Sequence, residues 1–397
     1  MELTKKQQIG LNIAIERYRN KEKFTVISGY AGSGKSTLVK FIIAALAQFN
    51  IDPETDVCYC AFTGKATQVL QKKGNRNVST LHKLLYESRP LPNGKFLHMP
   101  KAEVDYKIIV VDECSMAPKV LMQMLFRHNV YIIALGDPFQ LPTINPEDDN
   151  GLLEHPHVFL DEIMRQAQDS EIIQLSMKIR AQERIDNFRG KDVMVLSKNE
   201  LNTGMLLWAD QILVATNATR VSLNNQVRQL LGRGDKPEDG DKLICLRNYW
   251  GNFSEEANPL VNGTIGILSN SFETYFQMPR YLHGFPNKVD IISGDFVTDE
   301  NETYSSLEMD KKLILEGNPS LDSKQKYILG KSEKTEHLVP YEFTYGYAIT
   351  CHKSQGSQWP KVLGVEEGFP FNKVEHARWL YTNVTRAEEK YVLIRKE

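Results

Sequence analysis

The pattern of apolar and polar residues in the first 165 residues changes repeatedly between the period of a strand and the period of a helix. An apolar run at 24–27 is followed by the segment 35–50, where apolar residues recur at the spacing of one helix face. That face consists of Leu38, Phe41, Ile42, Ala45, Leu46 and Phe49. Three further apolar runs, rich in β-branched residues, occupy 56–62, 107–113 and 131–137. Such runs are typical of strands buried on both faces of a parallel sheet, so this part is predicted to form one α/β domain.

A second α/β domain is predicted, although its parts are separated in the sequence. Apolar runs that suit further buried strands lie at 210–217, 361–367 and 390–396. Between about 240 and 340 the pattern changes to short strands separated by Gly, Asn and Pro, which indicates a small β-rich insertion. Within the insertion, the charged segment 322–336 is predicted to be a loop.

The length and composition are those of a globular protein with more than one core. A chain of 397 residues exceeds what one hydrophobic core usually supports. We find no run that approaches the ~20 apolar residues needed to span a bilayer, and the first ten residues lack the apolar centre of a signal peptide. We therefore expect a cytoplasmic protein with no membrane partner. The cysteines are odd in number and fit no zinc spacing, so we expect reduced thiols at Cys58, Cys60, Cys114, Cys245 and Cys351.

The net charge of −2 does not by itself favour binding to nucleic acid. A nucleic-acid-binding protein needs only a local positive track. One candidate is the segment 64–76, with Lys65, Lys72, Lys73 and Arg76. A solvated helix face would explain this segment equally well.

A glycine-rich loop at 28–37 follows the first predicted strand and precedes the first predicted helix. Its spacing, Gly-x4-Gly-Lys-Ser, is that of a Walker A loop in the expected context. The glycines allow backbone N–H groups to surround phosphates, and the start of the helix attracts the same anion. Lys35 would reach the outer phosphates, and the Ser36 hydroxyl would bind Mg²⁺. We assign the nucleotide contacts of the loop to Gly29, Gly32, Gly34, Lys35, Ser36 and Thr37.

Acidic and amide side chains follow two other predicted strands. Asp112 and Glu113 come directly after a buried run. Asp112 would hold Mg²⁺ and Glu113 would activate a water molecule, which favours hydrolysis over transfer to another substrate. Gln140 follows the next buried run and is a candidate sensor of the γ-phosphate; an incidental residue in a Pro-rich turn is the alternative.

The order of these motifs resembles that of the superfamily 1 helicases, in particular the RecD/Dda-like 1B branch, over nearly the whole chain. The stretches that carry the resemblance are LTKKQ (3–7), CAFTGKAT (60–67), STLHKLL (79–85), LDEIMRQ (160–166), ATNATRVSLN (215–224), GYAITCHKSQGSQW (346–359) and YTNVTRAEEKYVLI (381–394). HKSQGS followed by VTRA is the most specific combination. The resemblance implies that Gln7 reads the adenine base and that Gln355 and Gly356 face the nucleotide.

The resemblance also implies that Arg165 and Arg386 are arginine fingers. Both are far from the glycine-rich loop in sequence, so a second domain would have to bring them to it. An arginine of this kind stabilises charge on the γ-phosphoryl group and is worth ~10³–10⁵ in rate in related systems. It also makes hydrolysis depend on closure of the cleft.

Residues that contact DNA are expected on both motor domains. Hydroxyl, amide and imidazole groups suit contacts to phosphate and sugar that do not read sequence. Phe62 would stack on a base, a contact worth ~1–3 kcal/mol, although a core position at a strand end is an equal alternative. The other candidates are Thr63, His82, Asn217, His352, Lys353 and Ser354.

A duplex-splitting hairpin is predicted at 89–100, where an Asn-Gly turn separates two short runs. Phe96 is the candidate wedge, and an ordinary exposed hairpin is the alternative. The resemblance sets the domain limits as follows: RecA-like motor domain 1A, 1–165, with the hairpin insertion 1B at about 86–104; RecA-like motor domain 2A, 166–240 and 341–397; inserted SH3-like domain 2B, 241–340.

The function implied is that of an ATP- and Mg²⁺-dependent 5′→3′ translocase, acting as a monomer, that moves on single-stranded DNA and unwinds duplexes at single-strand junctions. An RNA helicase is one alternative, because the 2′-hydroxyl decides the choice of sugar. A nucleotide-gated clamp that binds nucleic acid without moving is another. We find no sequence feature that indicates replication or repair proteins as partners.

Overall fold

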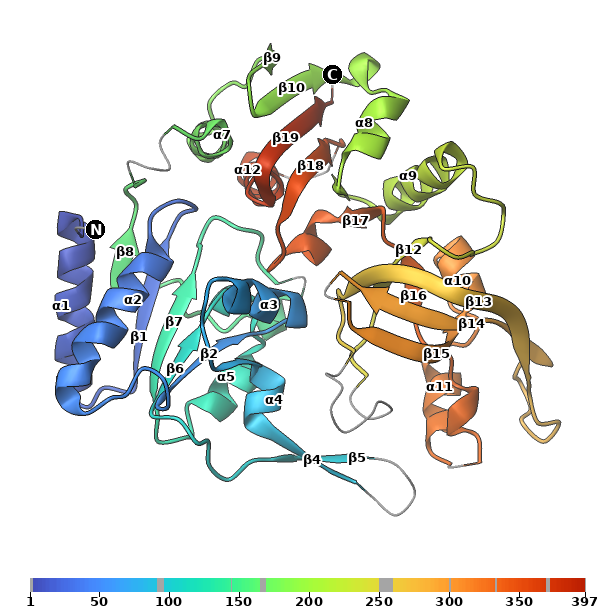
Figure 1. Ribbon diagram of the computed structural model, residues 1–397, viewed down its shortest axis with the longest axis horizontal. Helices are drawn as coiled ribbons and strands as arrows, with labels where there is room; N and C mark the ends of the chain where they lie inside the picture. The colour runs from blue at the N-terminus through green and yellow to red at the C-terminus, as the bar shows by residue number, and fades with distance from the viewer. Residues whose placement is uncertain are drawn as a thin grey trace. The chain divides into compact units, whose positions relative to one another are not determined.

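The computed structural model describes residues 3–90, 96–143, 145–164, 169–249, 260–299, 301–332, 334–368 and 372–396 (Figure 1). The chain divides into two compact units. The first consists of Met1–Arg89, His98–Leu201 and Cys351–Glu397, and the second of Pro90–Leu97 and Asn202–Thr350.

The N-terminal part of the first unit contains a sheet whose strand pairs are all parallel. Its order is β3-β2-β6-β7-β1-β8. The strands are β1 Phe24–Gly29, β2 Val57–Ala61, β3 Val78–Thr80, β6 Ile108–Val111, β7 Tyr131–Gly136 and β8 Val158–Leu160. Every residue of β6 and β7 is buried, as the continuous apolar runs predict.

Helices cover both faces of this sheet (Figure 1). They are α1 Lys5–Arg19, α2 Lys35–Leu46, α3 Gly64–Lys72, α4 Leu81–Leu85 and α5 Lys119–Leu125. Ile108 and Val110 pack with α1 and α2 in one apolar cluster. Their neighbours Ile109 and Val111 pack with α4 and α5 in another, because successive side chains of a strand point to opposite faces. The carboxyl ends of the strands therefore share one edge of a rigid three-layer domain.

The rest of the first unit is a second α/β layer. Its elements are α7 Glu171–Arg180, β9 Phe188–Arg189, β10 Val193–Ser197, β18 Trp359–Val365, α12 Lys373–Val384 and β19 Ala387–Arg395. Strand β19 pairs in parallel with β18 and with β10, and β9 pairs antiparallel with β10. Helices α7 and α12 pack together.

The second unit combines a short parallel pair with an antiparallel sheet. Its helices are α8 Thr203–Trp208, α9 Asn217–Leu230, α10 Lys311–Glu316 and α11 Ser323–Gly330. Its strands are β11 Gln211–Val214, β12 Lys242–Cys245, β13 Ile265–Gln277, β14 Lys288–Thr298, β15 Thr303–Asp310, β16 Phe343–Tyr345 and β17 Ala348–Thr350. Strands β11 and β17 are parallel, and the antiparallel sheet has the order β15-β14-β13-β12-β16.

One expectation for this region is wrong. The segment 322–336 was expected to be a loop, but most of it is helical, because α11 occupies Ser323–Gly330. The Asp322 side chain accepts a hydrogen bond from the Gln325 N–H, and Gln325 Oε1 accepts one from the Asp322 N–H. This capping box stabilises the first turn of a helix in an otherwise charged sequence.

The two strands of the predicted hairpin form a two-stranded sheet of β4 Tyr86–Pro90 and β5 Phe96–Pro100, and its Asn-Gly turn lies outside the described residues. Phe96 is the first residue of β5, and its side chain lies outside the described residues. All five cysteines are buried, reduced thiols. In the described part of the chain, none of the helices combines the length and the apolarity that crossing a membrane requires.

Candidate functional site

The phosphate loop joins β1 to α2 in the way its sequence predicts. Gly32 and Gly34 adopt φ of +76° and +81°, values that favour glycine. A Cβ on Gly34 would lie 2.4 Å from Gln7 Nε2, and a Cβ on Gly29 would lie 2.7 Å from the carbonyl oxygen of Leu160. The loop conformation and its close neighbours therefore both require glycine.

The Lys35 ammonium lies over this loop. Its Nζ donates hydrogen bonds to the carbonyl oxygens of Gly29 (2.6 Å) and Tyr30 (3.1 Å). The first turn of α2 carries Ser36 and Thr37 beside it. This arrangement places a cation and a helix N-terminus at one point, which suits phosphate groups.

Asp112 and Glu113 follow β6 at the edge of the sheet. Asp112 lines a cavity of about 190 Å³ together with Ser36 and Thr37. Desolvation and the adjacent Glu113 raise the pKa of Asp112, while Lys73 and Lys35 act in the opposite direction. A hydroxyl and a carboxylate are the hard oxygen ligands that Mg²⁺ prefers, so this donor set fits the ion.

Glu113 has an uncommon backbone conformation, with φ of +48°. This places a non-glycine residue in the left-handed region, a strain that clusters at functional sites. Its Oε1 accepts a hydrogen bond from Gln140 Nε2 at 3.4 Å. The structure thus brings together the two polar residues that were predicted from separate strand ends.

Gln7 lies on α1 with its side chain buried against the phosphate loop. Its Nε2 donates to the carbonyl oxygens of Ser33 and Gly34, both at 3.4 Å. Met164 also contacts this group through its sulfur, and the Met164 N–H donates to the Gly32 carbonyl. Arg165 lies outside the described residues, and its role as a finger stays a prediction.

The C-terminal segments of the same unit reach the residues after β7. Gln355 Nε2 donates to the Leu141 carbonyl at 2.6 Å, and the Leu141 N–H donates to Thr382 Oγ1 at 2.8 Å. Gly356 has φ of +73°, and a Cβ there would lie 3.1 Å from Thr63 Oγ1. Residues more than 200 positions apart in sequence are therefore neighbours here.

Arg386 follows α12 and is buried. Its Nε donates to the Thr382 carbonyl at 3.2 Å and its Nη1 to the Ser357 carbonyl at 3.3 Å. These bonds hold the guanidinium against α12 and the segment that carries Gln355.

The residues expected to contact DNA differ in their surroundings. Phe62, His82 and Tyr86 form a row, with ring centroids 5.7 and 6.3 Å apart. Asn217, the first residue of α9, is exposed and belongs to the second unit. Ser354 is fully buried, and its hydroxyl donates to the Cys351 carbonyl at 2.7 Å, so a DNA contact by this side chain stays a prediction.

The other candidates in the first unit are half-buried. Thr63 caps α3 by accepting a hydrogen bond from the Ala66 N–H at 3.2 Å. Desolvation lowers the pKa of His82 and of His352, so both side chains are neutral near pH 7. Lys353, next to His352, supplies positive charge in this segment.

Comparison with known proteins agrees with the motif order. A family described as an AAA domain matches residues 3–194, and one described as a UvrD-like helicase C-terminal domain matches residues 345–394. The ATP-dependent RecD2 DNA helicase of Deinococcus radiodurans is 26% identical over 93% of this chain and 46% of its own length. The ATP-dependent DNA helicase Dda of Enterobacteria phage T4 is 28% identical over 38% of this chain and 35% of its own length.

These matches support the assignment of the chain to the superfamily 1B helicases of the RecD and Dda type. This confirms the family predicted from the motifs. The chain spans less than half of either of these two helicases. A relative of similar extent is the uncharacterized protein R530 of Acanthamoeba polyphaga mimivirus, which is 26% identical over 97% of this chain and 98% of its own length.

Solved structures agree with this family at the level of the fold. A structure of Pif1 helicases on forked double-stranded DNA has a TM-score of 0.52 at 17% identity and covers 100% of this chain and 95% of its own. Pif1 from Bacteroides in complex with ADP-AlF3 and single-stranded DNA has a TM-score of 0.52 at 16% identity, with the same coverage. These likenesses confirm the predicted α/β fold with a parallel RecA-like sheet.

Two buried residues of this chain were missed by sequence reasoning. Asp137 follows β7, and its Oδ2 accepts a hydrogen bond from the Tyr381 hydroxyl at 2.6 Å. Desolvation raises the pKa of Asp137, and Lys35 opposes the shift. Asp137 carries the same signal as Asp112, an acidic residue directly after a buried strand, whereas no local pattern singles out Tyr381.

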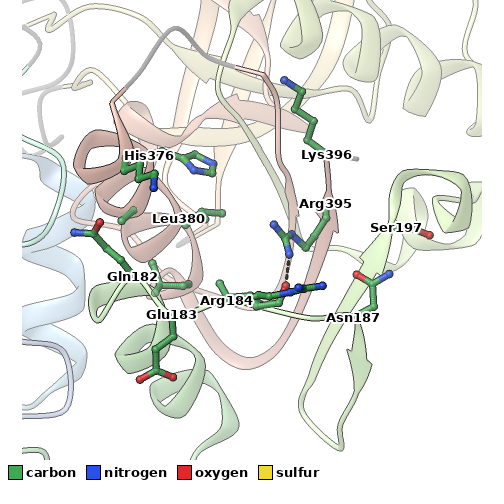
Figure 2. Close-up of a pocket in the computed structure, with 13 residues that line it drawn as sticks. Gln182, Glu183, Arg184, Asn187, Ser197, His376, Leu380, Arg395 and Lys396 are labelled. Atoms are coloured by element: carbon green, nitrogen blue, oxygen red, sulfur yellow. Dashed lines mark hydrogen bonds between the residues drawn. The ribbon is translucent and has the colours of Figure 1, made fainter.

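A separate cavity of about 700 Å³ lies at the C-terminal ends of β10 and β19, beside α7 and α12 (Figure 2). Its lining includes Arg184, His376 and Arg395, and Arg395 donates to the Ile185 carbonyl. Glu366 accepts hydrogen bonds from His376 and Arg395 beside it. None of the predicted nucleotide or DNA residues lines this cavity.

Proposed function

We propose that this chain is an ATP-driven motor that moves 5′→3′ on single-stranded DNA and unwinds duplex DNA. One observation supports this most directly: the phosphate loop, the acidic pair and Gln140 share a compact unit with the segments that carry Gln355 and Arg386. A motor must connect the γ-phosphate to moving parts, and an arginine-bearing segment beside the phosphate site suits that need. The named activities of the RecD2 and Dda relatives point the same way.

The proposed chemistry is hydrolysis of ATP. A water oxygen attacks the γ-phosphorus, the bond from that phosphorus to the β–γ bridging oxygen breaks, and Glu113 accepts the proton of the water. Lys35 stabilises charge on the outer phosphates, and Arg386 does so when it reaches the γ-phosphoryl group. Ser36 and Asp112 would hold Mg²⁺, which when bound offsets phosphate charge.

The remaining assignments support movement along a strand. Phe62 would stack on a base, and Thr63, His82, Asn217, His352 and Lys353 would contact phosphate or sugar on the two motor domains. We propose that these domains are 1–165 and, together, 166–240 with 341–397, with 241–340 inserted. Gln7 would bind adenine, and Arg165 would supply the second finger.

A strand-displacement assay with both tail polarities tests this function. A 5′-tailed duplex should be unwound in the presence of ATP and Mg²⁺, and a 3′-tailed duplex should not. Lys35→Ala is the matched negative control, because it removes the charge that binds the outer phosphates. Unwinding of the 3′-tailed duplex alone would overturn the polarity, and wild-type-like hydrolysis by Lys35→Ala would overturn the site.

ATPase and binding assays on the same purified protein distinguish this function from an RNA helicase and from a nucleotide-gated clamp. Hydrolysis stimulated by single-stranded RNA but not by DNA would favour an RNA helicase. Tight, nucleotide-dependent binding of single strands with no steady-state hydrolysis would favour a clamp.

A further inference from the structure

The hydroxyl group of Tyr381 connects three parts of the first unit. It accepts a hydrogen bond from the Ala31 N–H at 2.8 Å and donates one to Asp137 Oδ2 at 2.6 Å. Ala31 belongs to the phosphate loop, Asp137 follows β7, and Tyr381 lies on α12. The Tyr381 side chain is only 1% exposed, so water does not compete for these bonds.

A tyrosine hydroxyl can make both of the hydrogen bonds that position 381 requires. A tyrosine hydroxyl carries one donor and acceptor lone pairs, so it can receive the Ala31 N–H while donating to a carboxylate. The other oxygen of Asp137 accepts the Phe139 N–H at 3.0 Å, which fixes the carboxylate. The Tyr381 ring packs edge to face on Phe139, with centroids 5.3 Å apart. A phenylalanine at this position would keep the packing and lose both hydrogen bonds.

The same helix turn leads to the proposed arginine finger. Thr382, the next residue, accepts a hydrogen bond from Arg386 Nε through its carbonyl and one from the Leu141 N–H through its hydroxyl. The group that contacts the phosphate loop and the group that holds the guanidinium therefore lie on adjacent residues. The contact with the loop N–H and the contact with Arg386 thus lie within the last turn of α12 and the residues that follow it.

We propose that Tyr381 is a positioning residue that couples the phosphate loop to Arg386, so that the finger is placed according to the state of the loop. This inference rests on the proposed ATP hydrolysis. The hydroxyl bonds to Ala31 and Asp137 and not to the acidic pair or the predicted metal ligands, so Tyr381 acts as a positioning residue rather than a catalytic one. Loss of the hydroxyl should then lower turnover more than nucleotide affinity.

Tyr381→Phe tests the coupling in a steady-state ATPase assay with saturating single-stranded DNA. The expected result is a fall in kcat of roughly 10- to 100-fold, the range for losing a hydrogen bond to a charged group in the transition state. The KM for ATP should change by less than about threefold. In an Arg386→Ala background, Tyr381→Phe should cause no further loss of kcat, because residues that act as a unit are not additive.

Tyr391→Phe is the matched control. Tyr391 is also fully buried and also bonds through its hydroxyl to α12, donating to Asn383 Oδ1 at 2.9 Å. It does not contact the phosphate loop, so its kcat should equal that of the wild type. Thermal melting of both variants measures the structural cost of losing a buried hydroxyl. If Tyr381→Phe folds poorly, Asp137→Asn weakens the same bond from the other side and should lower kcat without raising KM.

Three results would overturn the coupling. They are an unchanged kcat in Tyr381→Phe, a rise in KM alone, and a loss of kcat that multiplies with that of Arg386→Ala. A wild type without DNA-stimulated hydrolysis would overturn the proposed function itself, and the inference with it. An active wild type with an unaffected Tyr381→Phe variant would overturn the inference alone.

Discussion

Replacing Arg228 by alanine should destabilise the second unit, because it breaks a buried ion pair. Arg228, on α9, donates from Nε to Asp241 Oδ1 at 3.0 Å and from Nη2 to Asp241 Oδ2 at 3.1 Å. The exposed fractions of the two side chains are 6% and 0%. The guanidinium also lies over the Tyr345 ring, with its central carbon 4.4 Å from the centroid.

The magnitude follows from what remains around Asp241. Removing one member of a buried ion pair typically costs ~3–5 kcal/mol, because the other charge stays buried without its partner. Asp241 keeps hydrogen bonds from the Glu238 N–H (2.9 Å) and the Tyr347 hydroxyl (3.0 Å). These partners offset part of the loss, so we expect a value near the lower limit, ~3 kcal/mol. For a unit of this size, that corresponds to a fall in melting temperature of roughly 6–12 °C.

Thermal melting followed by circular dichroism checks this value. Arg184→Ala is the control, since Arg184 pairs with Asp186 at 2.8 Å but the two side chains are 88% and 72% exposed. An exposed pair is worth at most ~1 kcal/mol. The double variant Arg228→Met with Asp241→Leu should recover most of the loss, because it leaves no buried charge. A melting temperature for Arg228→Ala within about 2 °C of that of Arg184→Ala would refute this reasoning.

Three further outcomes are expected. Glu113→Gln should keep ATP and single-strand binding in fluorescence titrations but lose turnover, and failure to bind nucleotide would instead make Glu113 structural. Phe96→Ala should lower the ratio of unwinding rate to ATPase rate on a 5′-tailed duplex, because an aromatic wedge stacks on the junction pair; an unchanged ratio would rule out the wedge. Burial lowers the pKa of His82, His157 and His352. The unfolded state therefore binds more protons, and the melting temperature should fall as pH decreases from about 7.5 to 5.5; a flat profile across that range would contradict this.

The parallel sheet of the first unit could be predicted because its signal is local. Strands buried on both faces need continuous apolar runs, and the runs at 107–113 and 131–137 became β6 and β7. The acidic residues of the candidate site could be predicted for the same reason, because polar residues directly after a buried strand must lie at the edge of the sheet. Asp112 and Glu113 follow this rule, whereas Gln140 lies four residues after the end of β7.

Contacts between distant residues could not be predicted in this way. The bond between Asp137 and Tyr381 joins positions 244 apart in sequence, and only the packing of α12 decides it. Helix α11 was missed for a different reason, since its signal in the sequence is local. Its capping residues Asp322 and Gln325 are a readable local signal, but the surrounding charges favoured a loop. The Lys326 side chain is in fact buried and paired with Glu342 at 2.8 Å.

Asp112 and Asp137 follow the neighbouring strands β6 and β7, but their carboxylate oxygens have different partners. Burial raises the pKa of both Asp112 and Asp137, and Lys35 opposes the shift in both. Asp137 uses one oxygen for the Phe139 N–H and the other for the Tyr381 hydroxyl, so its charge is committed to holding protein groups. Asp112 instead lines a cavity with Ser36, where a cation would compensate its desolvated charge. In the proposed function, Asp112 therefore serves the metal and phosphate chemistry, and Asp137 connects that chemistry to α12, the helix that precedes Arg386.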